Sequence, residues 1–261
     1  MATQTQRVGV VGHSQFKASA ALANQNAGYH NSIYRGKKLG ESVSADQYSQ
    51  ISAGTFDDMF IGDYWEINSV IWRIAAFDYW LHDGDTECTA HHVLIVPDSN
   101  LATAKMNNSN ATTGGYVGCD YYTAANSNTG KATAKSAIEG AFGSAHIMSH
   151  RQLLSNAVTN GVASGWAWYD STFELMSESM VYGAPISGAQ KTGDTNFNIG
   201  IDKTQLPLFQ HEPSRICNRA DWWLRDVVSA TNFALVTDRG NASYGGASNS
   251  FGIRPAFAIR A

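Results

Sequence analysis

The stretch FGIRPAFAI at residues 251–259 carries the strongest structural signal in the chain. Its larger apolar side chains recur at every second position, which is the period of a strand with one buried face. The expected buried face carries Phe251, Ile253, Pro255, Phe257 and Ile259, and the opposite face carries Gly252, Arg254, Ala256, Ala258 and Arg260. We therefore predict a C-terminal strand that contributes to the core.

The residues just before this strand, DRGNASYGGASNS at 238–250, have the opposite character. Tyr can anchor an adaptable contact surface on which Ser, Gly and Asn supply hydrogen bonds. An ordinary surface loop uses the same residues, so both interpretations stay open. If the stretch binds a ligand, the residues that we expect to do so are Asn241, Ser243, Tyr244, Ser248 and Asn249, with Trp222 and Arg225 as their scaffold or rim.

Composition limits the classes of protein to which the chain can belong. At 261 residues it can bury a sizeable core without disulfides or metals. Its 18 Lys and Arg against 22 Asp and Glu do not supply the basic surface that a nucleic-acid binder needs. The hydrophobic content of 43% argues against disorder.

The N-terminal sequence MATQTQRVGVVGHSQF lacks the apolar region of a secretory signal, and no stretch approaches the roughly 18–20 apolar residues of a membrane span. We expect a chain that is made in a cytoplasm and does not insert into a membrane. Cys88, Cys119 and Cys217 are widely separated, so we expect buried free thiols and no cysteine pair for a metal or redox site.

The order of expected elements predicts an α+β fold. Residues 1–40 are rich in polar and small residues, and we predict an extended N-terminal arm there and one domain over 41–261. Helices are expected at 45–53, 131–142, 150–161 and 171–183, a loop at 107–130, and strands at 64–68, 70–81, 91–98, 221–228, 232–238 and 251–259.

Clusters of chemically active side chains give weak signals. His82, Asp83, Asp85, His91 and His92 lie close in sequence, but successive strand residues point to opposite faces, so we expect a solvated hairpin rim there. His146 and His150 lack the glutamate of a metalloprotease motif. A paired-carboxylate hydrolase stays open, because its two acids need to be neighbours only in space. The acids considered are Asp57, Asp58, Glu174 and Glu178. We predict no catalytic residue, no metal and no cofactor.

The pair WWLRD at 222–226 and FGIRPAFAI at 251–259, with the small-residue run between them, resembles the C-terminal signature of a group of bacteriophage structural proteins. The resemblance spans most of residues 31–261. Upstream it includes YRGKKLG at 34–40, GTFDDMFIGDYWEINSVIWRIAAFDYW at 54–80, HHVLIVPD at 91–98, FGSAHIMSHRQLL at 142–154 and AWYDSTFELMSESMVYG at 167–183.

This resemblance implies a C-type-lectin-like fold, in which the first and last strands pair and a long irregular loop region projects from a small sheet. It also implies a virion protein in the tail tip, a fibre or a head decoration. The arm would attach it to other virion proteins, it would form a homo-oligomer, most plausibly a trimer, and its exposed loop would bind a host-surface glycan or protein. The alternatives are a purely structural capsid or tail decoration and a virion-associated glycan hydrolase.

Two further implications of the resemblance concern the loop and the ligand. Some proteins of this fold are diversified by retroelements, often at Asn codons, and Asn232, Asn241, Ser243, Tyr244, Ser248 and Asn249 occupy fitting positions. HEPS at 211–214 departs from the calcium-dependent lectin motif, and the solitary Cys217 departs from the cysteine pair of the related formylglycine-generating enzymes. Neither calcium-mediated sugar binding nor enzymatic activity is therefore expected.

Overall fold

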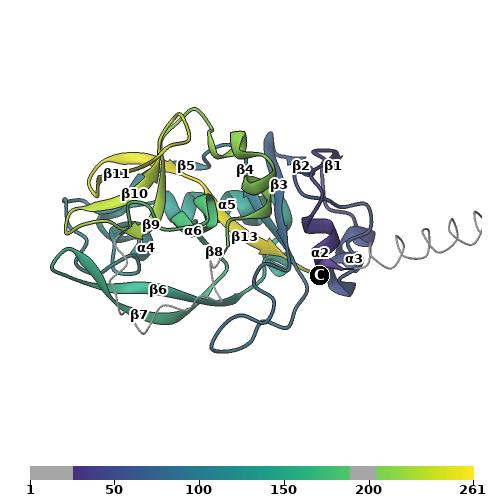
Figure 1. Cartoon of the computed structure of the whole chain (residues 1–261), viewed down its shortest axis with the longest axis horizontal. Coiled ribbons are helices and arrows are strands. Elements are labelled where there is room, and N and C mark those ends of the chain that lie inside the picture. The colour runs from purple at the N-terminus through teal and green to yellow at the C-terminus, as the bar shows by residue number, and fades with distance from the viewer. Residues whose placement is uncertain (1–25, 189–203) are drawn as a thin grey trace, which may run out of the picture.

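The C-terminal segment supplies two consecutive strands to two different sheets (Figure 1). The computed structural model describes residues 26–188 and 204–261. β12 (Ser250–Ile253) belongs to a five-stranded sheet and β13 (Pro255–Ile259) to a six-stranded sheet. All five residues of β13 are buried, so the expectation that only alternate residues would be buried is wrong. Strands on both sides and packing on both faces account for this burial.

The six-stranded sheet has the order β1-β2-β3-β4-β13-β8. Its other strands are β1 (Lys38–Gly40), β2 (Tyr64–Ile67), β3 (Val70–Phe77), β4 (Val93–Pro97) and β8 (Phe173–Leu175). The predicted hairpin of β2 and β3 and the predicted strand β4 are confirmed. The expected pairing of the first and last strands is wrong for the residues that the structure describes: β1 pairs with β2, whereas β4 and β8 occupy the two edges of β13.

The five-stranded sheet has the order β11-β10-β9-β12-β5. Its remaining strands are β5 (Ala102–Lys105), β9 (Trp222–Val227), β10 (Asn232–Val236) and β11 (Ala242–Gly246). The strands expected around 221–228 and 232–238 are confirmed as β9 and β10. β11 lies in the stretch expected to be a loop, and it forms because the turn after β10 folds the chain back in antiparallel register.

A two-stranded hairpin replaces a predicted helix. β6 (His150–Thr159) and β7 (Val162–Ser171) are antiparallel, so the helix expected at 150–161 is wrong. Asn160 and Gly161 form the turn with φ of 54° and 76°. Positive φ at both central residues is what a tight hairpin turn requires, and Asn-Gly is the sequence that favours it.

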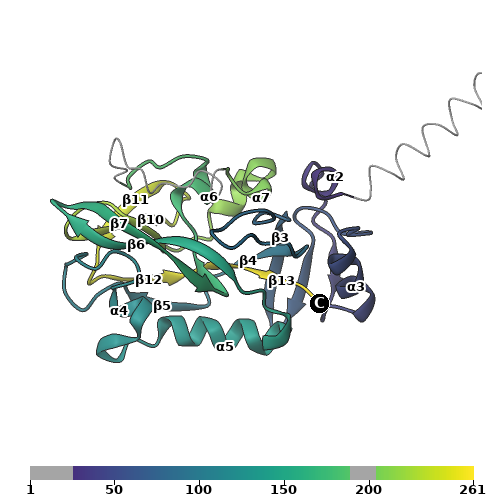
Figure 2. The same ribbon diagram turned by 90° about the horizontal axis from the view of Figure 1, so that it is seen from below.

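The helices cover the flanks of the sheets. They are α2 (Ala27–Asn31), α3 (Ala45–Ala53), α4 (Asp120–Thr123), α5 (Gly130–Phe142), α6 (Glu178–Tyr182) and α7 (Pro207–His211), with 3₁₀ helices η1 (Ala125–Ser127), η2 (Ser144–His146) and η3 (Pro213–Ile216). The predicted helices at 45–53 and 131–142 are confirmed as α3 and α5; α5 packs on β5 and β12 (Figure 2). The helix expected at 171–183 is wrong in its first half, where β8 lies, and only α6 is helical.

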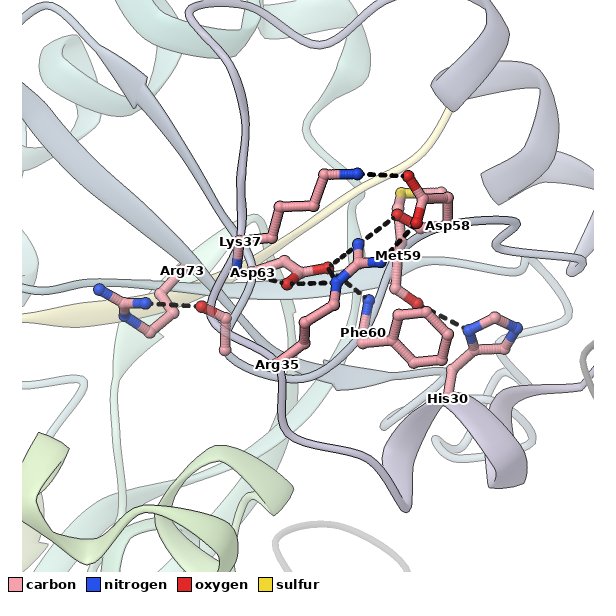
Figure 3. Close-up of polar contacts among 9 residues, drawn as sticks. His30, Arg35, Lys37, Asp58, Met59, Phe60, Asp63 and Arg73 are labelled. Atoms are coloured by element: carbon pink, nitrogen blue, oxygen red, sulfur yellow. Dashed lines mark hydrogen bonds and ion pairs between the residues drawn. The ribbon is translucent and has the colours of Figure 1, made fainter.

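Residues 26–40 belong to the folded domain, so the predicted boundary at residue 40 is wrong (Figure 3). His30 is buried, and its Nδ1 lies 2.7 Å from the Met59 carbonyl oxygen. Arg35 donates to both carboxylate oxygens of buried Asp63 from Nε, each at 3.1 Å. The Lys37 backbone N–H donates to the same carboxylate at 2.8 Å. These contacts are the physical reason that the segment lies on the sheet; residues 1–25 of the expected arm lie outside the described residues.

A buried histidine gives the fold a pH dependence. His150 stacks on Trp80 with ring centroids 3.8 Å apart, and Gln152 Nε2 lies 2.8 Å from its Nε2. Burial, with His92 nearby, lowers the pKa of His150 from 6.5 to about 3. The unfolded chain therefore binds a proton here between these two values and the folded protein does not, so folding stability falls as the pH drops below 6.5.

We expect this site alone to cost about 2 kcal/mol of unfolding free energy between pH 7 and pH 5. His150→Phe keeps an aromatic ring beside Trp80 and removes the titrating group. Urea unfolding of both proteins at the two pH values measures the effect, and the variant should lose less stability on acidification than the parent. Equal losses would contradict the assignment.

Candidate functional site

Five of the predicted ligand-binding residues, Asn241, Ser243, Tyr244, Ser248 and Asn249, lie on and beside the edge strand β11. We call residues 238–250 the β11 rim. Among residues 26–188 and 204–261, β10 is the one strand that pairs with β11. Thr237 N donates to Asn241 O and Ala247 N donates to Thr231 O, both at 2.9 Å. Main-chain groups of alternate β11 residues, counted from Asn241, therefore face β10. The main-chain N–H and C=O groups of Ala242 and Tyr244 therefore point toward the outer edge of the sheet.

Tyr244 is the most prominent side chain of the rim. It is 57% exposed, and the only other large hydrophobic side chain exposed to this degree in the described residues is Ile186, at 59%. The next residue, Gly245, faces the core: a Cβ there would lie 2.6 Å from the Phe251 ring and 2.9 Å from Leu235. The absence of a side chain at 245 lets β11 lie close against the core while Tyr244 points to solvent.

The turn after β11 is held by the loop that contains Asn110. Asn110 Oδ1 accepts hydrogen bonds from Ser248 N at 3.0 Å and Ser248 Oγ at 2.7 Å. Asn249 is exposed, and its N–H donates to Gly246 O at 2.9 Å. Ser248 is thus engaged in supporting the rim, whereas the Asn249 side chain faces solvent.

Asn241 and Ser243 complete the predicted set. Asn241 is exposed and its N–H donates to Thr237 Oγ1 at 3.1 Å, which leaves the side-chain amide at the surface. Ser243 is half-buried and lies opposite Leu235, on the side of the strand that Gly245 shares. Side chains of β11 alternate between faces, so Ser243 and Tyr244 do not point the same way.

Trp222 and Arg225 are scaffold residues and do not line the rim. Trp222 is fully buried, and the Arg254 guanidinium lies 5.1 Å from its ring centroid. Arg225 is 7% exposed; its Nη1 donates to Gln152 Oε1 at 2.9 Å and to Leu175 O at 3.2 Å. It thereby connects β9 to β6 and β8, which the sequence could not show because these strands are distant along the chain.

The second arginine of the signature is also structural. Arg254 is 1% exposed and donates to the carbonyl oxygens of Pro97 at 2.8 Å, Arg215 at 3.0 Å and Ile216 at 3.2 Å. Burial lowers the pKa of Arg254 to about 10. Its charge-assisted hydrogen bonds tie the junction of β12 and β13 to β4 and η3.

The histidines and acids near residue 82 do not form a common site. His92 is fully buried and accepts a hydrogen bond from Trp80 N at 3.1 Å, so the expectation of a solvated rim is wrong for this residue. His91 Nδ1 lies 2.7 Å from Asp78 Oδ2. Within residues 26–188 and 204–261, no group of three or more His, Cys, Asp or Glu side chains could hold a metal ion.

The acids considered for a hydrolase serve internal contacts. Glu174 is 3% exposed and accepts from Ser171 Oγ at 2.6 Å and Tyr116 Oη at 2.7 Å, and Lys131 Nζ lies 3.3 Å from both of its oxygens. Burial lowers the pKa of Lys131 although Glu174 opposes that shift. This network was not predicted from sequence, because its members come from three separate segments, around residues 116, 131 and 171–174.

Glu178 is likewise buried, and its carboxylate is occupied by internal hydrogen bonds. Its carboxylate accepts the backbone N–H groups of Ile186 at 2.9 Å, Ser187 at 2.9 Å and Gly188 at 2.6 Å. The neighbouring Asp226 accepts from Glu178 N at 2.7 Å, and burial, with the Glu178 charge, raises the pKa of Asp226 to about 6. Asp58 forms ion pairs with Arg35 and Lys37, and Asp57 is exposed.

Cysteine positions agree in part with expectation. All three thiols are free; Cys119 is buried, whereas Cys88 and Cys217 are partly exposed. In the part of the chain that the structure describes, no helix combines the length and the apolar character that a membrane crossing needs.

Comparison with known proteins finds one family model, which matches only the C-terminal part of the chain. Residues 145–261 match the family model described as "Domain of unknown function (DUF6273)". This matched region begins just before β6 and includes β9, the β11 rim and β13. No curated protein and no solved structure matches the chain.

Proposed function

We propose that the protein is a non-enzymatic structural component of a bacteriophage virion, in the tail tip, a fibre or a head decoration. The β11 rim binds a glycan or protein on the host surface. The resemblance of the WWLRD and FGIRPAFAI segments to phage structural proteins supports the class. The observation that carries the binding role is the 57% exposure of Tyr244 at the centre of an edge strand.

The support beneath the rim favours this role over that of an incidental loop. Gly245 and Ser248 hold the strand and the turn to the body of the domain, whereas Asn241, Tyr244 and Asn249 face solvent. Exposed side chains on a rigid strand can change without loss of core contacts, and binding residues are often displayed on a scaffold in this way. The role needs no metal and no cofactor.

A C-type-lectin-like arrangement is part of the proposal. It rests on the resemblance of the signature segments alone, because β13 pairs with β4 and β8 and not with the first described strand. Residues 1–25 attach the domain to other virion proteins, and the assembled form is a homotrimer by analogy with other repeated phage parts.

Substitution of the rim tests the binding role. Tyr244→Ala combined with Asn249→Ala removes the aromatic anchor and an exposed amide, and it touches no buried contact. We expect at least about a tenfold loss of adsorption to host cells, since an aromatic anchor at the centre of an interface commonly contributes 2 kcal/mol or more. The melting temperature should stay within about 2 °C of the parent, because surface substitutions change stability little.

Ile186→Ala is the matched control, because Ile186 is equally exposed and lies outside the rim. It should leave adsorption unchanged. If the rim variant still adsorbs like the parent while immunolabelling finds the protein on intact particles, the purely structural alternative replaces the proposed role. Release of reducing ends from host wall polysaccharide by the purified protein would instead indicate a hydrolase.

A further inference from the structure

The tryptophans of the chain divide into two groups. Five of the seven are buried to 1% exposure or less: Trp65, Trp72, Trp80, Trp222 and Trp223. The other two, Trp166 and Trp168, are partly exposed and lie two residues apart on β7. This placement is unlike that of the adjacent pair Trp222 and Trp223, which the fold buries.

By strand alternation both partly exposed tryptophans share the face of the β6–β7 hairpin that carries Leu153, and Trp166 also packs against the hydrophobic core. Register places Leu153 opposite Trp168 and Ser155 opposite Trp166. The inner face is marked by Gln152 and Leu154, each 1% exposed, because alternate residues of a strand point to opposite sides. In Figure 2 the hairpin lies nearest the viewer, outside the two larger sheets.

Leu153, Trp166 and Trp168 form an apolar stripe, and polar groups surround it. Arg151 and Asp170 continue the outer face beyond Trp168, with Nη1 and Oδ1 3.2 Å apart, and Arg151 Nε donates to Asp85 Oδ1 at 2.7 Å. The Asp170 side chain is 78% exposed. At the other end of the stripe, the Ser164 hydroxyl lies 2.9 Å from that of Thr159. The stripe is therefore apolar at its centre and bounded by hydrogen-bonding groups.

The size of the stripe limits what can occupy it. Within the described part of the chain, Leu153, Trp166 and Trp168 are its only large apolar side chains, and even a whole aromatic side chain offers only about 150–250 Å². A stable protein interface needs about 800 Å² from each partner. Arg151 is paired with two carboxylates, so the surface also lacks the free positive charge that would attract a polyanion or an anionic membrane.

We propose that Trp166, Trp168 and Leu153 form a second binding surface, specific for neutral oligosaccharides. A pyranose ring has an apolar face whose C–H groups carry slight positive charge, which complements the negative face of an indole ring. Its hydroxyls match the Arg151, Asp170 and Ser164 groups at the border. Positions two apart on a strand are roughly 6.6–7 Å apart, so two indoles contact successive parts of one chain of sugars. This surface is distinct from the β11 rim and does not rest on its proposed role.

The test uses the purified full chain on an array of neutral and acidic oligosaccharides, with maltohexaose and chitohexaose as soluble probes in titrations of tryptophan fluorescence. We expect neutral glycans alone to bind. Trp166→Ala and Trp168→Ala should each weaken binding about tenfold, which corresponds to the loss of one aromatic contact. Trp168→Phe should retain most of the affinity, because it keeps an aromatic face.

Ile186→Ala serves as the control, because Ile186 is exposed and belongs to neither proposed surface, and it should bind the neutral glycans like the parent. Thermal unfolding verifies that each variant is folded, and Trp168→Phe keeps the test informative if an alanine variant is not. Three results would overturn the proposal: no neutral glycan bound by the parent, equal affinity in folded Trp168→Ala, or binding of acidic glycans alone. Loss of host adsorption with intact neutral-glycan binding would implicate the β11 rim and leave this surface standing.

Discussion

Asp63→Ala is expected to lower the free energy of unfolding by about 3–5 kcal/mol, the usual effect of removing one partner of a buried ion pair. Asp63 is fully buried and accepts hydrogen bonds from Arg35, from Lys37 N at 2.8 Å and from Phe60 N at 2.9 Å (Figure 3). The substitution leaves two backbone N–H groups and a partly buried guanidinium without this acceptor. The segment around Arg35 should therefore detach before the rest of the domain unfolds.

Urea unfolding at pH 7 gives the stability, and limited digestion with trypsin gives the local effect. Cleavage after Arg35 should be fast in the variant and slow in the parent. Glu66→Ala is the matched control, because its pair with Lys38 Nζ, 2.7 Å away, is exposed to solvent and contributes little to stability. A loss below 1 kcal/mol in Asp63→Ala would show that residues 26–40 are not held by this contact.

Arg254→Met is expected to cost about 3–5 kcal/mol, because three carbonyl groups lose their donor in the interior. Methionine replaces much of the aliphatic stem, so the effect comes mainly from the guanidinium and not from an empty cavity. The guanidinium also lies near the rings of Trp222 and Phe209, at 5.1 and 5.7 Å from their centroids. Loss of these contacts adds to the destabilisation.

Chemical denaturation of Arg254→Met and of the control Arg239→Met measures the change in the free energy of unfolding. Arg239 is exposed on the β11 rim, and its replacement should change stability by less than about 0.5 kcal/mol. Arg254→Lys should lie between parent and Arg254→Met, since an ammonium cannot reach three carbonyls in the geometry of the guanidinium. Equal stability of Arg254→Met and the parent would mean that the signature arginine has a role other than holding the sheets together.

Elements with strong local signals were predicted correctly. α3 has a capping box, in which Ser44 Oγ accepts from Gln47 N and Gln47 Oε1 accepts from Ser44 N, and it ends at Gly54 with φ of 69°. The β2–β3 hairpin turns at Asn68 and Ser69, both with positive φ. The hydrogen bonds that decide such features join residues a few positions apart, so the sequence contains the information directly.

The β6 segment shows where this information was misread. Its apolar residues fit a helical period loosely, and a glycine such as Gly161 commonly ends a helix, so the local pattern predicts a helix. Alternate burial of His150, Gln152 and Leu154 identifies a strand, but two of these residues are polar, and their burial depends on Trp80 and Arg225. Such polar side chains can be buried because distant segments supply their hydrogen-bond and stacking partners.

Some features of the candidate sites were predicted from the sequence, and others became visible only in the fold. The composition of residues 238–250 predicted an exposed tyrosine among small residues, and Tyr244 is exposed. Sequence could not separate the buried tryptophans at 222–223 from the partly exposed pair at 166 and 168, because all four lie in strands of similar apolar character.

By itself, therefore, the sequence determined the α+β class, the turns and caps, and the small-residue rim before the last strand. The tertiary structure alone decided that this last segment divides between two sheets, that both signature arginines are buried, and that residues 26–40 belong to the domain. The reason is physical: turns and caps depend on neighbours in the chain, whereas burial, ion pairs and sheet order depend on segments that meet only after folding.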